Sequence, residues 1–345
     1  MQEYLKKVVS RQDLTAEEAS HAMTAIMTGE AGEISTAALL TALAMKGETP
    51  VEIEAFARSM RKAAVAWTGR SEDAILDTCG TGGDRSNTIN LSTLSALVLA
   101  SAGLKVAKHG NRAVSSSTGS ADLLEALGIS LGVQSPEVLD QCLNQTKIAF
   151  LFAQAWHPAM KHAGPVRRAL GFRTVFNLLG PLTNPAPVTH QLVGVFDARF
   201  LEPVAATLLH LGRKAAYVVH AENGLDEISP AGGTRYFRVQ DGKVESGTWK
   251  PEDFGFSSFP LSAIVAKDKA ASVDRARAIV SGQGTQEENA AISMNAAPLY
   301  AAVRGVDLKT AAGACEQLLK QGAPGKVLEA WQKFTSEKDL SVGAG

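Results

Sequence analysis

The chain has 345 residues, of which 45% are hydrophobic, and its 34 basic residues nearly balance its 35 acidic ones. This length allows two domains, or one large α/β domain with an appendage, and the apolar fraction is ample for a buried core. A net charge of −1 argues against a surface built mainly to bind nucleic acid, so we expect no nucleic-acid partner.

Three cysteines, Cys79, Cys142 and Cys315, lie far apart in the sequence and form neither a metal-ligand spacing nor a disulfide framework. Buried thiols in a reducing compartment are the simplest interpretation. The N-terminus lacks a basic segment followed by an apolar run, and no stretch of about 18 apolar residues could span a membrane. The sequence therefore predicts a cytoplasmic protein with no membrane partner.

The chain up to about residue 70 has the pattern of helices only. Thr15 and Glu18 form a capping box before a helical run that Gly29 should end. Thr49, followed by a proline, predicts the start of another helix that extends to about Ala66. A small all-helical N-terminal domain is therefore expected.

Beyond about residue 74, short apolar runs alternate with helical stretches. This alternation predicts a mostly parallel sheet covered by helices on both faces. A hairpin is expected over residues 234–250, turning at Asp241-Gly242, and the chain should close with helices. The strands predicted before the hairpin are residues 74–76, 104–107, 148–152, 191–196 and 215–219.

A glycine-rich loop follows the first predicted strand, where residues 77–84 read Asp-Thr-Cys-Gly-Thr-Gly-Gly-Asp. Its glycines let backbone N–H groups approach an anion closely, and the N-terminus of a helix near Ser92 favours negative charge. A tight structural turn is the alternative to phosphate binding here. The spacing is not Gly-x-Gly-x-x-Gly, which disfavours a nicotinamide dehydrogenase.

A second polar segment, residues 108–120, follows the next predicted strand. Lys108 and Arg112 can meet phosphate oxygens there, while serines and backbone amides can add hydrogen bonds. Such loops gather at the carboxyl ends of strands in open α/β sheets, where ligands bind. Two polyanion sites after successive strands suggest a ligand with phosphates at two ends. For His109, a structural role and a ligand contact both remain open.

Five separated motifs resemble, in the same order, the signature motifs of the anthranilate phosphoribosyltransferases. They are Gly80–Asp84, Asn90–Thr93, Lys108–Arg112, His157–Met160 continuing to Asn177–Pro185, and Gly224–Glu227.

The resemblance implies a fold and an activity. It implies a helical domain at residues 1–70, completed by helices from about 165–190, and an α/β domain at 71–345 with a nucleoside-phosphorylase-like phosphoribosyltransferase fold. It also implies a homodimer that requires Mg²⁺. The activity would be transfer of the phosphoribosyl group of phosphoribosyl pyrophosphate to the amine of anthranilate, with release of pyrophosphate, in tryptophan biosynthesis.

The resemblance also implies the binding residues for phosphoribosyl pyrophosphate. Because the attacking aromatic amine is neutral near pH 7 and needs no prior deprotonation, we assign catalysis to these binding groups and to no covalent nucleophile. Arg85 stands where the family loop often has another glycine, which would stiffen the loop or add a charge near the pyrophosphate. The residues that correspond to this site are Gly80, Gly83, Asp84, Thr88, Asn90, Leu91, Ser92, Thr93, Lys108, His109, Gly110, Asn111, Arg112, Ala113, Val114, Ser115, Ser116 and Ser120.

Two smaller sets complete the implied site. The residues that correspond to anthranilate contacts are Gly80, Asn111 and Arg167. Those that correspond to Mg²⁺ ligands are Ser92, Asp226 and Glu227. All three supply hard oxygen donors, which suit Mg²⁺ rather than zinc.

Helical phase separates Arg167 from its neighbour Arg168. Over about residues 158–170, Arg167 shares a face with small and apolar residues and should turn inward, whereas Arg168 shares a face with Lys161 and should meet solvent. An inward arginine needs an anion, either the carboxylate of a ligand or one of the protein. The sequence predicts the former.

Two other functions fit the same fold. A pyrimidine nucleoside phosphorylase would need no pyrophosphate–metal site, so the glycine loop together with Asp226 and Glu227 favours the transferase. A non-catalytic nucleic-acid-binding relative would carry a basic surplus and eroded substrate motifs, and the sequence has neither.

Overall fold

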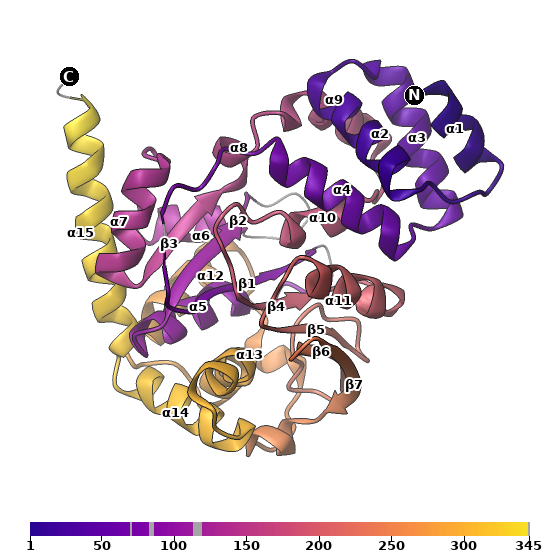
Figure 1. The fold of residues 1–345 in the computed structure, drawn as a ribbon. Helices are drawn as coiled ribbons and strands as arrows, with labels where there is room; N and C mark the ends of the chain where they lie inside the picture. Colours follow the sequence, from indigo (N-terminus) through magenta and orange to yellow (C-terminus); the bar gives the residue numbers. More distant parts are fainter. Residues whose placement is uncertain (70, 83–85, 113–118, 344–345) are drawn as a thin grey trace.

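The computed structural model describes residues 1–69, 71–82, 86–112 and 119–343 of the chain. Figure 1 shows a bundle of N-terminal helices beside a larger α/β part that is built on one twisted sheet. The C-terminal helix α15 (Ala323–Gly343) lies on the side of the sheet away from this bundle. Within the described ranges, no helix combines the length and the apolar character needed to cross a membrane.

Two of the N-terminal helices begin where their capping residues, Thr15 and Thr49, predict. The Thr15 hydroxyl accepts from the Glu18 N–H, and the Glu18 carboxylate accepts from the Thr15 N–H, so the predicted capping box is confirmed. Gly29, with φ 82°, ends this helix in the left-handed conformation. The helices are α1 (Gln2–Val9), α2 (Ala16–Thr28), α3 (Gly32–Lys46) and α4 (Pro50–Lys62).

Helix α4 ends at Lys62, so the predicted extension to Ala66 is wrong. The chain leaves the helix because it docks on the α/β part. The Val65 N–H donates to the Trp156 carbonyl at 2.9 Å, and the Trp67 ring stacks on the Trp156 ring with centroids 5.8 Å apart. These long-range contacts replace the last helical turn.

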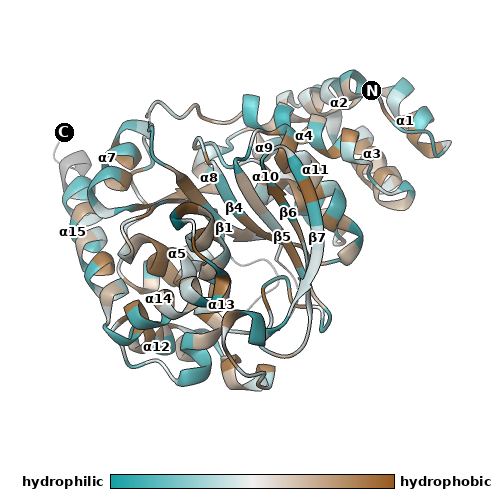
Figure 2. Cartoon of the chain, turned by 60° about the horizontal axis from the view of Figure 1, so that its bottom comes forward, coloured by the Kyte–Doolittle hydropathy of each residue, from teal (hydrophilic) through white to brown (hydrophobic). Residues whose placement is uncertain are grey.

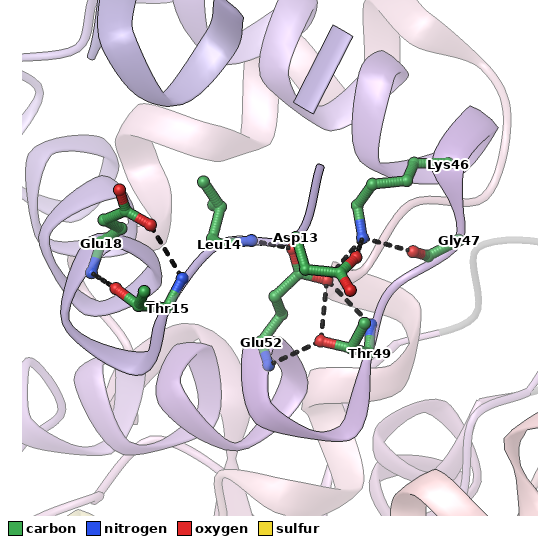
Figure 3. A network of polar contacts seen from close by, with 8 residues as sticks. All are labelled: Asp13, Leu14, Thr15, Glu18, Lys46, Gly47, Thr49 and Glu52. Atoms are coloured by element: carbon green, nitrogen blue, oxygen red, sulfur yellow. Dashed lines mark hydrogen bonds and ion pairs between the residues drawn. The ribbon is translucent and has the colours of Figure 1, made fainter. Parts of the chain in front are cut away.

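A buried carboxylate ties the turns of the bundle together (Figure 3). Glu52 is fully buried, and one of its oxygens accepts from the Leu14 N–H at 2.9 Å. The other oxygen accepts from the Thr49 N–H at 2.8 Å and from the Lys46 ammonium at 2.9 Å. Lys46 also pairs with Asp13 at 2.7 Å. One side chain of α4 therefore joins the segment before α2 to the turn between α3 and α4.

The strands form a seven-stranded sheet in the order β3-β2-β1-β4-β5-β6-β7. The first five strands of this order are parallel, and β6 and β7 pair antiparallel as the predicted hairpin. A mostly parallel sheet is thus confirmed. The strands are β1 (Ile75–Gly80), β2 (Lys105–Gly110), β3 (Ile148–Phe152), β4 (His190–Gly194), β5 (Ala215–Ala221), β6 (Thr234–Gln240) and β7 (Lys243–Trp249).

Strands β1 and β2 are longer than predicted, and this changes the place of two candidate residues. Lys108 and His109 lie within β2, paired with Phe150 and Leu151 of β3, and not in the loop that follows the strand. The predicted strand ended at Ala107, and lysine is rarely buried, so local preference disfavours a strand that continues through Lys108. Pairing with a neighbouring strand outweighs that local preference.

Helices cover both faces of the sheet. Helix α5 packs on β1 and β2, α13 packs on β4 and β5, and α11 packs on the opposite face of β5. The remaining helices are α5 (Leu91–Ser101), α6 (Ser120–Ala126), α7 (Pro136–Thr146), α8 (Ala153–Trp156), α9 (Met160–Leu170), α10 (Phe176–Leu182), α11 (Leu201–His210), α12 (Lys269–Val280), α13 (Gln286–Arg304) and α14 (Leu308–Lys320), with short 3₁₀ turns at Ala198–Phe200, Pro251–Phe254 and Leu261–Ile264.

Two apolar cores result from the alternation of side chains along the central strands. In β4, Leu192 belongs to the core beneath α5 and α13, whereas Val193 belongs to the core beneath α11. The second core continues through α9 and α10 into the N-terminal helices. Figure 2 shows brown stretches in the central strands, while the edge strand β7 is pale to teal, in keeping with its largely exposed side chains.

Candidate active site

The sheet changes its winding direction between β1 and β4. From β1 the chain proceeds to β2 and β3 on one side, and β4 and β5 lie on the other. Ligands of open α/β sheets bind outside the carboxyl ends of the strands at such a point. Here those ends are Gly80 and Gly194, which are direct register partners. The Thr81 N–H donates to the Gly194 carbonyl at 2.9 Å and carries the pairing one residue further.

The acidic loop (Gly224–Glu227) lies directly over these two glycines. A Cβ atom on Gly80 would be 2.8 Å from Asp226 Oδ2, and one on Gly194 would be 1.5 Å from the Asp226 carbonyl oxygen. The Gly82 N–H donates to Asp226 Oδ2 at 2.7 Å. The glycine loop and the acidic loop, which the sequence treats as separate motifs, are therefore in direct contact. The role of Gly194 was not predicted.

Ser92 and Lys108 meet beside Thr78 of β1. Asn90 caps α5 by accepting from the Thr93 N–H at 3.0 Å, and this places the Ser92 hydroxyl in the first turn. The Lys108 ammonium donates to Ser92 Oγ at 3.1 Å and to the Thr78 carbonyl. Burial lowers the pKa of Lys108, and the nearby carboxylates of Asp77 and Glu227 oppose that shift. Lys108 is therefore a buried cation next to the acidic loop.

Asp77 joins three segments of the site, although none of the sequence motifs gives it a role. It is fully buried in β1, and Oδ1 accepts from the His109 N–H at 3.2 Å. Oδ2 accepts from the side-chain amides of Asn184 at 2.9 Å and Gln191 at 3.1 Å. Burial raises the pKa of Asp77, and the charge of Lys108 opposes the rise. An ionisable residue inside an apolar strand was the signal that could have revealed this network.

His109 makes internal contacts through both ring nitrogens. Nδ1 lies 3.1 Å from the Gly180 carbonyl, and Nε2 lies 3.2 Å from Nε2 of His157. A carbonyl can only accept, so His109 Nδ1 carries the hydrogen and His109 Nε2 accepts from His157. Burial lowers the pKa of His109 to about 3 and that of His157 to about 4, so both rings are neutral near pH 7.

The residues after β2 are held by the start of α6. Ser120 Oγ donates to the Asn111 carbonyl at 3.3 Å. A Cβ atom on Gly110 would be 2.2 Å from Ser120 Oγ. The Arg112 guanidinium pairs with Glu125 and lies 5.4 Å from the centre of the Phe152 ring. Arg112 would have to exchange Glu125 for phosphate oxygens to bind a ligand as predicted.

The remaining predicted residues either make contacts within the fold or lie outside the described residues. Thr88 forms an isolated antiparallel bridge with Val265, and Leu91 is a buried core residue at the start of α5. The positions that lie outside the described residues are Gly83, Asp84, Arg85, Ala113, Val114, Ser115 and Ser116.

Arg167 and Arg168 lie on different faces of α9, as the helical phase predicts. Arg168 is exposed, whereas Arg167 is partly buried, and burial lowers its pKa. The Arg167 guanidinium lies 5.3 Å from the centre of the Phe176 ring at the start of α10. Among the described residues, no carboxylate forms an ion pair with Arg167.

The donor set near the acidic loop fits a hard cation. Ser92 contributes a hydroxyl, and Asp226 and Glu227 contribute carboxylates, which are the ligand types that Mg²⁺ prefers. Nowhere in residues 1–69, 71–82, 86–112 and 119–343 do three or more His, Cys, Asp or Glu side chains meet as a metal-binding group. A Mg²⁺ ion held here would therefore have few protein ligands among the described residues, as is common for Mg²⁺ bound together with substrate phosphates.

Family models match both parts of the chain. One described as the glycosyl transferase family, a/b domain, matches residues 72–324, and one described as the glycosyl transferase family, helical bundle domain, matches residues 2–64.

Relatives named anthranilate phosphoribosyltransferase match the chain over nearly its whole length. The protein from Symbiobacterium thermophilum is 44% identical, over 97% of this chain and 98% of the relative. The protein from Moorella thermoacetica is 45% identical, over 94% of this chain and 96% of the relative.

Solved structures agree with these matches. The anthranilate phosphoribosyltransferase (TrpD) of Thermus thermophilus superposes with a TM-score of 0.90 at 40% identity, covering 96% of this chain and 99% of that one. The Saccharomyces cerevisiae enzyme in complex with PRPP and Mg gives a TM-score of 0.87 at 26% identity and covers 97% of each chain. The chain therefore belongs to the anthranilate phosphoribosyltransferase family.

Proposed function

We propose that this protein transfers the phosphoribosyl group of phosphoribosyl pyrophosphate to the amine of anthranilate, giving N-(5-phosphoribosyl)anthranilate and pyrophosphate, in tryptophan biosynthesis. The observation that carries the proposal is the acidic loop at Asp226, which lies over the glycine ends of β1 and β4 at the switch point of the sheet. Complexes of the S. cerevisiae relative with PRPP and Mg and with 4-fluoroanthranilate support it.

The reaction depends on positioning of the two substrates more than on acid–base catalysis. The amine nitrogen of anthranilate forms a bond to the anomeric carbon of the ribose, the bond from that carbon to the pyrophosphate oxygen breaks, and the amine then loses a proton to solvent. An aromatic amine is neutral near pH 7 and needs no prior deprotonation. Accordingly, the two buried histidines are engaged with each other and with Gly180, and neither is required as a base.

Stabilisation of the leaving group is the main electrostatic task. A bound Mg²⁺ would supply positive charge to the departing pyrophosphate, and Ser92, Asp226 and Glu227 would hold it. The N-terminus of α5 and the backbone of the glycine loop would bind phosphate oxygens. Lys108 adds a positive charge beneath them, where its distance from water strengthens its effect.

Anthranilate would lie between Gly80, Asn111 and Arg167. The planar guanidinium of Arg167 matches a benzoate carboxylate with two parallel hydrogen bonds. Its partial burial, its lowered pKa and its lack of a partner carboxylate among the described residues are what an anion-binding arginine would show before its ligand arrives.

Loss of anthranilate fluorescence on mixing the protein with phosphoribosyl pyrophosphate and Mg²⁺ tests the activity, and constant fluorescence would contradict it. Asp226→Asn combined with Glu227→Gln should cripple turnover and change its dependence on Mg²⁺. Glu252→Gln combined with Asp253→Asn is a matched control, since this adjacent acidic pair is exposed. Normal turnover of the first double variant at every Mg²⁺ concentration would exclude the metal role.

The helical part of the protein is proposed to form the homodimer. Ile34 and Met45 on α3 are 88% and 73% exposed, and Val9 on α1 and Val51 on α4 add further exposed apolar surface. These exposed apolar side chains on three helices of the bundle support an interface in this part of the protein. Sedimentation at micromolar concentration should give a dimer, and Ile34→Glu with Met45→Glu should shift it towards the monomer. A wild-type monomer would refute the proposal.

We assign residues 1–70 to the helical domain and 71–345 to the α/β domain. Helix α9 packs on α2 and α3, and α10 packs on α4, which supports completion of the helical domain by the segment at about 165–190. The unpaired thiols of Cys79, Cys142 and Cys315 fit a reducing compartment, and we propose the cytoplasm.

A further inference from the structure

The acidic loop is held from its far side by a residue of α13. Asn295 is completely buried, and its Oδ1 accepts from the Ile228 N–H at 2.8 Å. Its Nδ2 donates to the Ile228 carbonyl at 2.9 Å and to the Ala291 carbonyl of its own helix at 2.9 Å. One amide therefore satisfies both polar groups of the residue that directly follows Glu227.

Few other side chains could make this contact. An amide offers a donor and an acceptor side by side, whereas a carboxylate offers only acceptors and a leucine of similar size offers neither. The bond to Ala291 fixes the orientation of the Asn295 amide relative to α13. A buried amide in a helix core is costly unless its hydrogen bonds are made, and here the two bonds to Ile228 join it to a second segment of the chain.

The loop is also fixed on the side that precedes Glu227. There the Asp226 carboxylate accepts from the Gly82 N–H at 2.7 Å, and the Asp226 carbonyl packs against Gly194. Glu227 thus lies between two anchored residues, Asp226 on one side and Ile228 on the other. With both flanking peptides held, little backbone freedom remains to Glu227.

We propose that Asn295 is a positioning residue that sets the geometry of Asp226 and Glu227 for a divalent cation. The proposal rests on the metal role of these acids in the function proposed above. Asn295 touches neither the cation nor a substrate in this arrangement. It acts through the peptide of Ile228, in the way that outer hydrogen bonds orient the ligands of a metal.

A purely structural role of Asn295 in the packing of α13 would give a different result, and Asn289 offers the matched control. Asn289 lies on the same helix, is 4% exposed, and donates to the Gly284 carbonyl at 3.3 Å. Asn289→Leu therefore removes a buried amide of α13 that bonds to the segment before the helix and not to the acidic loop. Both leucine variants should lose some thermal stability, but only Asn295→Leu should change cation binding.

The test is a titration of the full-length protein with Mn²⁺ alone, with free Mn²⁺ followed by electron paramagnetic resonance. Asn295→Leu should weaken Mn²⁺ binding roughly 10- to 100-fold, while Asn289→Leu should bind like the wild type. The apparent Mg²⁺ requirement of turnover should rise in parallel for Asn295→Leu, with the Michaelis constant for anthranilate unchanged.

Asp226→Asn combined with Glu227→Gln separates the two ways in which the result can fail. If this double variant binds Mn²⁺ like the wild type, the metal site itself is wrong. If the double variant loses Mn²⁺ but Asn295→Leu keeps the wild-type affinity, the metal site stands and the role of Asn295 is overturned. Should circular dichroism show that Asn295→Leu does not fold, Asn295→Ala takes its place, because it removes both bonds to Ile228 without adding bulk. Wild-type Mn²⁺ affinity in that variant would equally overturn the proposal.

Discussion

The Asp226 carbonyl oxygen lies 1.5 Å from the position that a Cβ atom on Gly194 would occupy. Strand β4 ends at Gly194, whose φ lies outside the left-handed region, so glycine is needed there for space and not for its conformation. The acidic loop can pass this close to the end of β4 only because Gly194 has no side chain.

Gly194→Ala should therefore displace the acidic loop while leaving the two cores intact. A shift of about 1 Å at a reacting centre can cost roughly 100-fold in rate, and we expect a loss of that order in kcat/KM. Gly313→Ala in α14 is the control, since an added Cβ meets nothing within 4 Å there. Enzyme assays with circular dichroism measure both effects, and full activity of a folded Gly194→Ala variant would contradict the prediction.

Arg167→Ala should weaken anthranilate binding and largely spare phosphoribosyl pyrophosphate. Loss of one charge-assisted pair costs on the order of 2–3 kcal/mol, or roughly 30- to 150-fold in apparent affinity. Arg168→Ala is the matched control because Arg168 is exposed on the same helix. The two Michaelis constants of each variant decide the matter, and a larger anthranilate defect in Arg168→Ala would reverse the assignment.

The buried pair His109 and His157 should make stability depend on pH. The unfolded rings take up protons near pH 6.5, whereas the folded rings do so only near about 3 and about 4. Between these values the unfolded state binds more protons, so this contribution is complete above about pH 6.5 and is lost as the pH falls. Each ring should lower the free energy of unfolding by roughly 3 kcal/mol when the pH falls from 7 to 4.

Urea denaturation of His157→Gln at the two pH values checks this expectation. The loss of unfolding free energy between pH 7 and pH 4 should be smaller in His157→Gln than in the wild type. His21→Gln is the control for the substitution itself, since it replaces an exposed histidine with the same residue. Equal losses in the wild type and in His157→Gln would show that the pair does not govern acid stability.

Glu52→Ala should destabilise the protein by about 3 kcal/mol, because it leaves two backbone N–H groups without their acceptor in a buried site and removes one of the two carboxylates that pair with Lys46. The free energy of unfolding from urea titration measures the effect. Glu30→Ala, which changes an exposed glutamate, should stay close to the wild type. A Glu52→Ala midpoint equal to that of the wild type would be incompatible with the network in Figure 3.

Features that depend on neighbouring residues were predictable from the sequence. The capping box at Thr15, the helix start at Thr49 and the hairpin at Asp241-Gly242 formed as predicted, because capping and turn formation act within a few residues of the chain. The alternation of strands and helices likewise predicted a mostly parallel sheet. The five motifs identified the family, because a motif is recognised from its residue types and their spacing and does not depend on where the fold places it.

Only the tertiary structure decided how these motifs meet. Gly82 and Asp226 are 144 residues apart and Ile228 and Asn295 are 67 apart, yet each pair shares a hydrogen bond. Lys108 became part of a strand because β3 pairs with it, and α4 ended early because Trp67 docks on Trp156. Such contacts depend on which distant surfaces approach, and neither local propensity nor periodicity along the chain contains that information.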